Sequence, residues 1–278
     1  MDLVFSDIHA DIDGLQAILD VAFSPGFEEK YGRVSRIVNL GDLLERGTAP
    51  KQVLQKMAEL AGSYPVISVM GNHDEGFLYG RQISGSSQSS LQAHNLLSSQ
   101  DLEFFKENGD GTFGSQYAID AKDRLFCVHG GPLDPDTITK NGEDPWLYQR
   151  TWQRLSEESE FYSHYGYHYK PSSAFEEGRK HFEGFIILCG HQHTEAVIRQ
   201  DGDLITNMWT FEHELEKISS GALKKYEFPI ERNSNYIIRV GLGGPQGHHT
   251  GKFSNPHFAI IQEDPRRAVL FEIEKSLN

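Results

Sequence analysis

The sequence is poor in cysteine and has no long apolar run. It has two cysteines among 278 residues, Cys127 and Cys189, which excludes a disulfide-dense scaffold. Both lie in apolar runs, as buried free thiols of a reducing compartment would. No apolar run approaches the roughly 20 residues that a membrane-spanning helix needs. No basic leader precedes the first apolar run, so we expect a cytoplasmic protein with no membrane partner.

Basic residues are also scarce. Lysine and arginine number 26 against 40 aspartates and glutamates, which gives a formal net charge of -14. Proteins that track long nucleic acid usually carry a basic stripe, so this balance argues against DNA or RNA as a partner. A small phosphorylated substrate, such as a nucleotide or a phosphoprotein side chain, stays compatible with it, because bound divalent cations reverse the sign of the local field.

The hydrophobic pattern at the start of the chain alternates between two periods. Apolar runs at 3–5, 37–40 and 65–70 predict buried strands. Between them, apolar residues at helical spacing predict helices over 12–22 and 50–61. This order is typical of an α/β sheet whose functional site lies at the carboxyl ends of its strands.

The rest of the chain predicts shorter elements. A polar connection is expected between Ser24 and the second strand, and serine and glutamine dominate 84–99, where we expect a solvated turn leading into a helix over 91–106. Aromatic residues concentrate in 132–184, which we interpret as an insertion within a single domain of residues 1–278. Further strands are predicted at 117–119, 125–128, 185–188, 195–199, 203–206, 236–240, 258–262 and 268–273.

Five polar motifs follow the predicted strands: Asp7-Ile8-His9, Gly41-Asp42, Gly71-Asn72-His73-Asp74, His129-Gly130-Gly131 and Gly190-His191-Gln192-His193. Residues two apart at a strand end can point toward one spot, so Asp7 with His9, and His191 with His193, each form half a site. Imidazole and carboxylate ligands together suit manganese, iron, zinc or cobalt better than calcium or magnesium. We therefore predict a metal site in which Asp42 is shared by two ions.

As an ordered set, these motifs resemble those of the calcineurin-like metallophosphoesterase superfamily. The set reads Asp-x-His, Gly-Asp-x-x-Glu-Arg-Gly, Gly-Asn-His-Asp, His-Gly-Gly and Gly-His-x-His, and it extends over residues 7–193, about two thirds of the chain. The resemblance implies an αββα sandwich of two mixed β-sheets flanked by helices. Residues 132–184 would add a helical and aromatic insertion to it.

The resemblance includes more than one branch of the superfamily. Residues 41–47 and 129–131 resemble phosphoprotein phosphatases and symmetrical dinucleoside tetraphosphatases. Residues 190–193 and a glycine-rich stretch at 240–247 resemble small prokaryotic phosphodiesterases. The substrate is therefore open among phosphoproteins, dinucleoside polyphosphates, cyclic nucleotides and lipid-derived phosphodiesters. The sequence does not determine the oligomeric state.

The same resemblance implies two divalent ions with seven ligands. One ion would be held by Asp7, His9, Asp42 and His193, and the other by Asp42, Asn72, His129 and His191. The implied activity is a metal-dependent phosphatase or phosphodiesterase, in which a hydroxide that bridges the ions attacks phosphorus in line. The alternative is a catalytically silent protein of the same fold that binds or scaffolds without turnover.

Three further residues have roles implied by the resemblance. His73 would stabilise or protonate the leaving oxygen, unless it is a hydrogen-bonded structural histidine. In the phosphatase branch an Asp-Arg pair orients this histidine and grips phosphate. Here Arg46 is either a bidentate phosphate contact or the partner of Glu45 in a surface ion pair. Glu45 exceeds aspartate by one methylene, so its reach to His73 is open.

Two other features stay open. The aromatic insertion either stacks a nucleobase as a cap, with Tyr165 and Tyr167 as test positions, or packs on itself as a hydrophobic subdomain. His248 and His249 follow the glycine-rich stretch and are candidate substrate contacts. The other histidines have no ligand spacing and are expected to be surface or hydrogen-bonded residues: His94, His164, His168, His181, His213 and His257.

Overall fold

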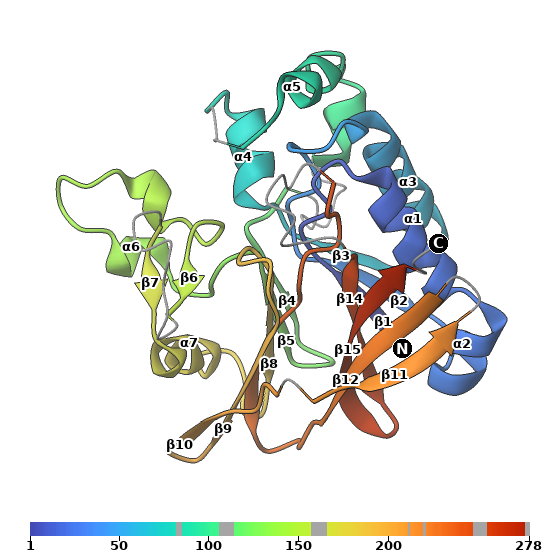
Figure 1. Ribbon diagram of the computed structural model, residues 1–278. Coiled ribbons are helices and arrows are strands. Elements are labelled where there is room, and N and C mark those ends of the chain that lie inside the picture. The colour runs from blue at the N-terminus through green and yellow to red at the C-terminus, as the bar shows by residue number, and fades with distance from the viewer. Residues whose placement is uncertain are drawn as a thin grey trace.

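Two mixed β-sheets face each other, and helices cover the outer side of each, so the predicted αββα sandwich is confirmed (Figure 1). The computed structural model describes residues 1–81, 85–105, 114–156, 166–210, 212–218, 221–246 and 255–275. Within these ranges, no helix is long and apolar enough to cross a membrane.

The first sheet contains seven described strands, of which β1, β2 and β3 are parallel to one another. β14 pairs antiparallel with β1 on the other side, and the remaining strands continue the sheet antiparallel. Because three neighbouring strands run in the same direction, the loops at their carboxyl ends meet at one edge. In spatial order the strands are β11 (Glu214–Ile218), β12 (Gly221–Pro229), β15 (Arg266–Lys275), β14 (His257–Glu263), β1 (Asp2–Phe5), β2 (Arg36–Asn39) and β3 (Val66–Ser68).

The second sheet contains six described strands, with β5, β8 and β13 parallel at its centre. Its inner face packs against the first sheet through fully buried residues such as Leu188 and Ile238, which join Val4 and Val38 in one core. In spatial order the strands are β10 (Leu204–Asn207), β9 (Ala196–Asp201), β13 (Asn235–Arg239), β8 (Ile186–Cys189), β5 (Leu125–Val128) and β4 (Tyr117–Asp120).

Three helices pack on the outer face of the first sheet: α1 (Ile12–Ala22), α2 (Pro25–Tyr31) and α3 (Pro50–Ser63). Asp11 caps α1 by accepting a hydrogen bond from Gly14 N at 2.9 Å. The prediction of a polar connection after residue 24 is wrong. Ser24 caps a second helix there, and Pro25 stands at its first position, where its fixed φ favours helix formation.

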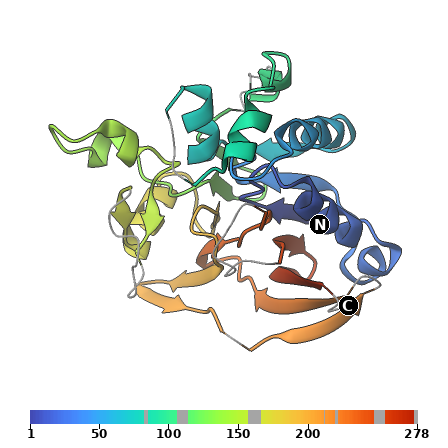
Figure 2. The ribbon, with the colours of Figure 1, turned by 45° about the horizontal axis from the view of Figure 1, so that its top comes forward.

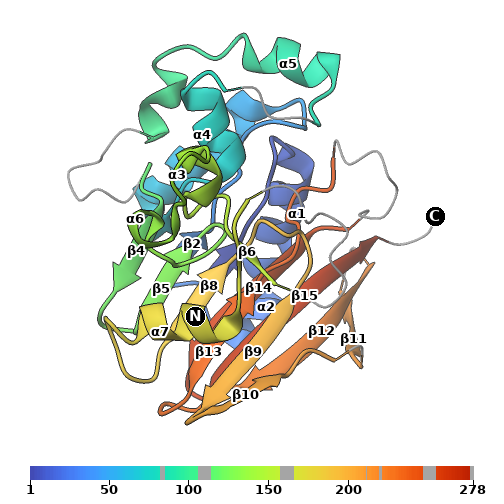
Figure 3. The same cartoon turned by 90° about the vertical axis from the view of Figure 1, so that its left-hand side faces the viewer.

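Shorter helices lie at the end of the sandwich where β1 and β2 terminate (Figures 2 and 3). They are α4 (Asn72–Leu78), α5 (Gln88–His94) and the 3-10 helix η1 (Asp101–Phe105). The prediction of one helix over 91–106 is wrong. Asp101 Oδ2 accepts hydrogen bonds from Ser98 N (2.8 Å) and Ser98 Oγ (2.7 Å), and this local side-chain bonding starts a separate turn.

The described parts of the aromatic segment, 132–156 and 166–184, lie beside the second sheet (Figure 1). The helix α7 packs Phe175 against the outer face of that sheet. A division into one domain with 132–184 inserted stays a prediction. The elements are α6 (Pro135–Ile138), the 3-10 helix η2 (Pro145–Tyr148), the parallel strands β6 (Arg154–Leu155) and β7 (His168–Tyr169), and α7 (Pro171–Gly178).

Candidate metal and active site

The loops that follow β1 and β2 are joined by backbone hydrogen bonds. Asp7 N donates to Gly41 O at 2.9 Å, and His9 N donates to Asp42 O at 2.8 Å. The backbone is left-handed at Asp7 (φ 56°), His9 (φ 50°) and Asp42 (φ 56°). Such a conformation costs roughly 1–3 kcal/mol at a residue other than glycine, and it is found most often at functional sites. The hydrogen bonds between the two loops therefore hold a strained backbone in place, and this backbone fixes the positions of three polar side chains.

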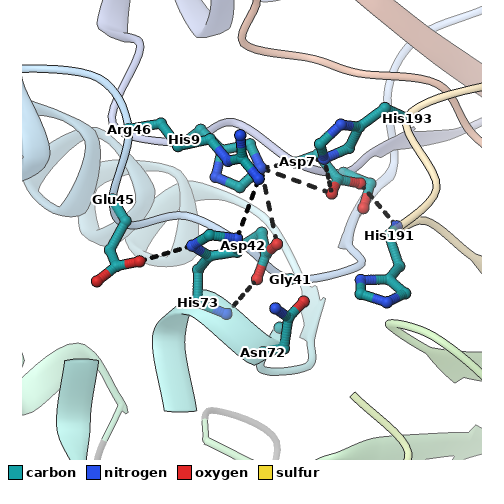
Figure 4. A network of polar contacts seen from close by, with 12 residues as sticks. Asp7, His9, Gly41, Asp42, Glu45, Arg46, Asn72, His73, His191 and His193 are labelled. Carbon is teal, nitrogen blue, oxygen red and sulfur yellow. Dashed lines mark hydrogen bonds and ion pairs between the residues drawn. The ribbon is translucent and has the colours of Figure 1, made fainter. Parts of the chain in front are cut away.

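The second sheet supplies histidines from the opposite side. His129 follows β5, His191 and His193 follow β8, and the two loops are joined by a hydrogen bond from Gly190 N to His129 O (2.8 Å). His191 N donates to Asp7 Oδ2 at 3.0 Å, which connects the loops of the two sheets. Figure 4 shows the side chains from both sheets in one network.

Asp7, His9 and His193 form the first group of converging donor atoms. His193 Nε2 lies 3.2 Å from Asp7 Oδ1 and 3.2 Å from His9 Nε2. His9 Nδ1 lies 3.2 Å from the carbonyl oxygen of Leu44, which favours a proton on Nδ1 and leaves the Nε2 lone pair facing the group. One cation between these three atoms would satisfy all of them.

Asp42, His129 and His191 form a second group, which Asn72 joins. His129 Nε2 lies 3.2 Å from Asp42 Oδ2 and 3.2 Å from Asn72 Oδ1. Asp42 Oδ2 is also 3.7 Å from His9 Nε2, so the same oxygen faces histidines of both groups. The structure thus brings together all seven residues for which the sequence predicts a ligand role.

Three buried atoms that could bind a metal ion have no hydrogen bond among the described residues. Asp7 Oδ1, Asp42 Oδ2 and His191 Nε2 are fully shielded from solvent, and none of the three has a hydrogen-bond partner among the described residues. Uncompensated burial of such groups costs several kcal/mol, roughly 1–3 each and more for charged ones. Buried imidazole nitrogens and carboxylate oxygens that converge in this way can bind divalent cations, so the residues present match the metals that the resemblance implies.

The electrostatics keep both carboxylates ionised. Burial raises the pKa of Asp42, but the neighbouring His129 and His73 outweigh it and hold the pKa below its usual range. At Asp7 burial likewise raises the pKa, but the neighbouring His193, whose Nε2 lies 3.2 Å from Oδ1, outweighs it and lowers the pKa overall. Burial lowers the pKa of His129, yet Asp42 raises it to about 9 overall. Burial lowers the pKa of His191 well below its ordinary value, which keeps that imidazole neutral.

His73 and Glu45 form a buried pair beside the second group. Glu45 Oε2 lies 2.6 Å from His73 Nδ1, so the longer side chain does reach the histidine. His73 N donates to Asp42 Oδ1 at 2.9 Å, which ties the pair to the shared carboxylate. Arg46 is half-buried, and its Nη2 lies 3.4 Å from His73 Nε2, so its guanidinium faces the site (Figure 4).

The sequence interpretation missed residues that the insertion brings to the site. Arg154 in β6 is close enough for Asp42 and Asp7 to raise its pKa, although burial lowers it to about 10 overall. The Trp152 ring packs 6.2 Å from the His191 ring, and its buried Nε1 has no hydrogen-bond partner among the described residues. Gln192 accepts from Leu155 N (2.8 Å) and donates to Leu155 O (3.1 Å). No spacing signal in the sequence identifies these residues.

The remaining candidates are placed as follows. Tyr167 packs on Tyr148 at 5.5 Å, whereas Tyr165, His164, His248 and His249 lie outside the described residues. Among the other described histidines, His94 and His257 are hydrogen-bonded and His181 and His213 are exposed, as predicted, whereas His168 is half-buried. His257 Nδ1 bonds to Glu195, His181 packs on Phe126, His168 and His213 are not in the groups above, and His94 is buried next to Glu45.

Comparison with known proteins agrees with this geometry. A family model described as calcineurin-like phosphoesterase matches residues 3–195. A solved metallophosphoesterase from Sphaerobacter thermophilus is 21% identical, with a TM-score of 0.57 over 99% of this chain and 88% of that one. A hypothetical protein from Pyrococcus horikoshii OT3 is 14% identical, with a TM-score of 0.59 over 100% and 90%. At these identities the likeness shows the fold alone. No curated protein matches the chain.

Proposed function

Because the chain belongs to the calcineurin-like phosphoesterase family, we propose that it is a hydrolase of phosphate mono- or diesters that uses two divalent ions. The observation that carries the proposal is the convergence of seven candidate ligand side chains from five loops, in which three buried ligand atoms have no hydrogen bond among the described residues. The ions, when bound, supply positive charge for phosphate oxygens and lower the pKa of an attacking water. Manganese, iron, zinc and cobalt all suit these ligands.

The chain's own residues would position the ester and protonate its leaving oxygen. Arg46 and Arg154 approach the site from opposite loops, and their guanidinium groups can each bind two phosphate oxygens. Glu45 orients the His73 imidazole through Nδ1 and leaves Nε2 to hold a proton for the leaving oxygen. The ester oxygen then departs as a neutral alcohol rather than as an alkoxide.

A catalytically silent scaffold is the competing function. Such a protein would need the fold and at most the metal ligands. The buried Glu45–His73 pair, tied to Asp42 at 2.9 Å, serves no purpose in a scaffold. Two arginines beside the site favour a phosphorylated substrate, and the net charge of -14 favours a small one, such as a nucleotide or a phosphorylated side chain, over long nucleic acid.

The test is hydrolysis of para-nitrophenyl phosphate and its bis ester, followed by a nucleotide and phosphopeptide panel, with added Mn²⁺. We expect metal-dependent turnover. For an ester with an alkyl leaving group, such as β-glycerophosphate, we expect His73→Asn to lower kcat by roughly 100-fold with little change in metal content. Asp42→Asn should lower both bound metal and turnover. The exposed His181 provides a matched control, and His181→Asn should behave as the unaltered protein does. Full metal binding without turnover of any panel member would favour the scaffold.

A further inference from the structure

Glu45 and Arg46 share an unusual backbone conformation. Both are left-handed, each with φ 64°, at consecutive positions. Two adjacent residues other than glycine in this region store strain of roughly 1–3 kcal/mol each, which the surrounding structure must offset. The conformation decides where the Glu45 carboxylate and the Arg46 guanidinium point, so whatever holds it controls both side chains.

The backbone N–H groups of these two residues are bonded to one segment, residues 85–94. Glu45 N donates to His94 Nε2 at 2.7 Å, and Arg46 N donates to Ser86 Oγ at 3.0 Å. Gly85 lies against Arg46 as well, because a Cβ at that position would stand 3.1 Å from Arg46 Nη1. Residues 85–94, which we call the clamp segment, thus contact both members of the pair.

His94 is built into the clamp segment as an acceptor. The residue is 3% exposed, and its Nδ1 lies 2.8 Å from the carbonyl oxygen of Ser90 one helical turn earlier. The proton on Nδ1 is therefore donated to the Ser90 carbonyl oxygen within α5, and the Nε2 lone pair accepts the hydrogen bond from Glu45 N. The ring packs 5.5 Å from Phe77 in α4, the helix that carries His73.

We propose that His94 is a positioning residue for the Glu45–His73 pair. It holds the Glu45 backbone in the left-handed conformation from which the carboxylate reaches His73 Nδ1 at 2.6 Å. Glutamate has one more rotatable bond than aspartate, so a fixed backbone is needed to keep its carboxylate on the imidazole. The inference rests on the proposed function for its catalytic consequence, but the backbone contact itself does not depend on turnover.

Three variants separate an acceptor from a space-filling side chain. His94→Leu fills much of the volume without an acceptor. His94→Gln places Oε1 the same number of bonds from Cα as His Nε2, and should restore the bond to Glu45 N. Gln92→Ala changes an exposed residue of the same helix and controls for disturbance of α5. Circular dichroism and thermal unfolding of each variant show whether the fold is kept.

The first readout does not use activity. In the full chain labelled with ¹⁵N-histidine and loaded with diamagnetic Zn²⁺, the His73 Nδ1 proton bonded to Glu45 should give a strongly downfield resonance. Glu45→Gln and His73→Asn assign that resonance by removing it. We expect His94→Leu to shift or remove it, and His94→Gln and Gln92→Ala to keep it. A folded His94→Leu protein with the resonance unchanged would overturn the proposal.

The second readout compares leaving groups. An alkyl phosphate needs its leaving oxygen protonated, whereas para-nitrophenolate leaves without help. His94→Leu should therefore lower kcat for β-glycerophosphate roughly 10- to 100-fold more than kcat for para-nitrophenyl phosphate, with the same selectivity as His73→Asn. An equal loss on both esters would show a merely structural role and overturn the proposal. If the unaltered protein hydrolyses neither ester, the proposed function fails while the resonance still decides the role of His94.

Discussion

Burial gives Cys127 a chemistry different from that of a surface thiol. Cys127 lies two positions before His129 along the chain. It is fully shielded from solvent, and this burial raises the pKa of its thiol to about 12. Only the thiolate reacts with disulfide reagents, and at pH 8 its fraction would be about one in ten thousand. Cys189 is buried at the corresponding end of β8. Proximity to the metal groups thus does not make either cysteine reactive.

We predict that the folded protein resists thiol labelling. With dithiobis-nitrobenzoate at pH 8, neither cysteine should react on a timescale of minutes, and two equivalents should react in urea. Cys127→Ala should reduce the unfolded count to one and serve as the control. Fast labelling in native buffer would mean that these strand ends open, in contradiction to their burial.

At the residue scale, the sequence predicts the positions of site residues that directly follow a strand. Asp7, Asp42 and His129 follow apolar runs, so each could be placed at a strand end and therefore at one edge. Arg154 could not be found in this way, since its position depends on how the insertion packs through the Gln192–Leu155 bonds. The sequence predicts a surface or hydrogen-bonded histidine at His94. It is hydrogen-bonded, and one of its two partners, Glu45 N, is 49 residues away along the chain.

The loop after β13 supports the loop after β1. Gly243 N donates to Ser6 O at 2.9 Å, and Gly244 N donates to Asp7 O at 3.0 Å. A Cβ on Gly244 would stand 1.8 Å from Ile8 O, a backbone atom that cannot turn aside. The glycine-rich stretch is therefore required for close backbone contact with the loop that carries Asp7 and His9.

We predict that Gly244→Ala destabilises the protein by roughly 1–3 kcal/mol and weakens metal binding, because the first loop must move away. Gly62→Ala is the matched control. Gly62 lies in α3 with no atom within 4 Å of an added Cβ, so alanine should stabilise the protein by about 1 kcal/mol. Urea unfolding and a metal titration measure both effects. Equal stability and affinity in Gly244→Ala would show that the loop gives no support.

At the element scale, strands with continuous apolar runs could be predicted, and strands of mixed composition could not. β12 alternates buried Leu223 and Lys225 with more exposed neighbours, and its lysines and glutamates hide the pattern. β11 was missed for the same reason. The order of strands in each sheet was also beyond prediction, because β14 pairs with β1 across some 255 residues, a contact no local pattern indicates.

The candidate site connects the two halves of the molecule. Strands of the first sheet lead into the segments that carry Asp7, His9, Asp42 and Asn72. Strands of the second sheet lead into the loops that carry His129, His191 and His193. At the other end of β2, Arg36 bonds to Asp2 in its own sheet and to Asp120 in β4 of the second sheet. The sandwich is thus joined by charged groups at both ends and by apolar packing between them.

We therefore predict that metal binding stabilises the whole fold, and more so at higher pH. An ion at 100 times its Kd adds about 2.7 kcal/mol to the free energy of unfolding if it binds the folded state alone. In the metal-free protein, Asp42 raises the His129 pKa to about 9. The interaction of protonated His129 with Asp42 therefore stabilises the fold fully below pH 6.5, and this stabilisation is lost as pH rises through 9. A metal ion must displace the proton from His129 in order to bind there, so the stabilisation by metal increases as pH rises over the same range.

Thermal unfolding with chelator and with Mn²⁺ between pH 6.5 and 9 measures both trends. We expect the metal-free protein to lose stability as pH rises while the difference caused by Mn²⁺ increases, and His129→Gln should flatten both curves. Because the candidate ligands come from both sheets, hydrogen exchange should slow together in the loops after β1 and β8 when metal binds. Protection confined to one sheet would mean that the ions hold only half of the sandwich, and the seven ligands would then not act as one site.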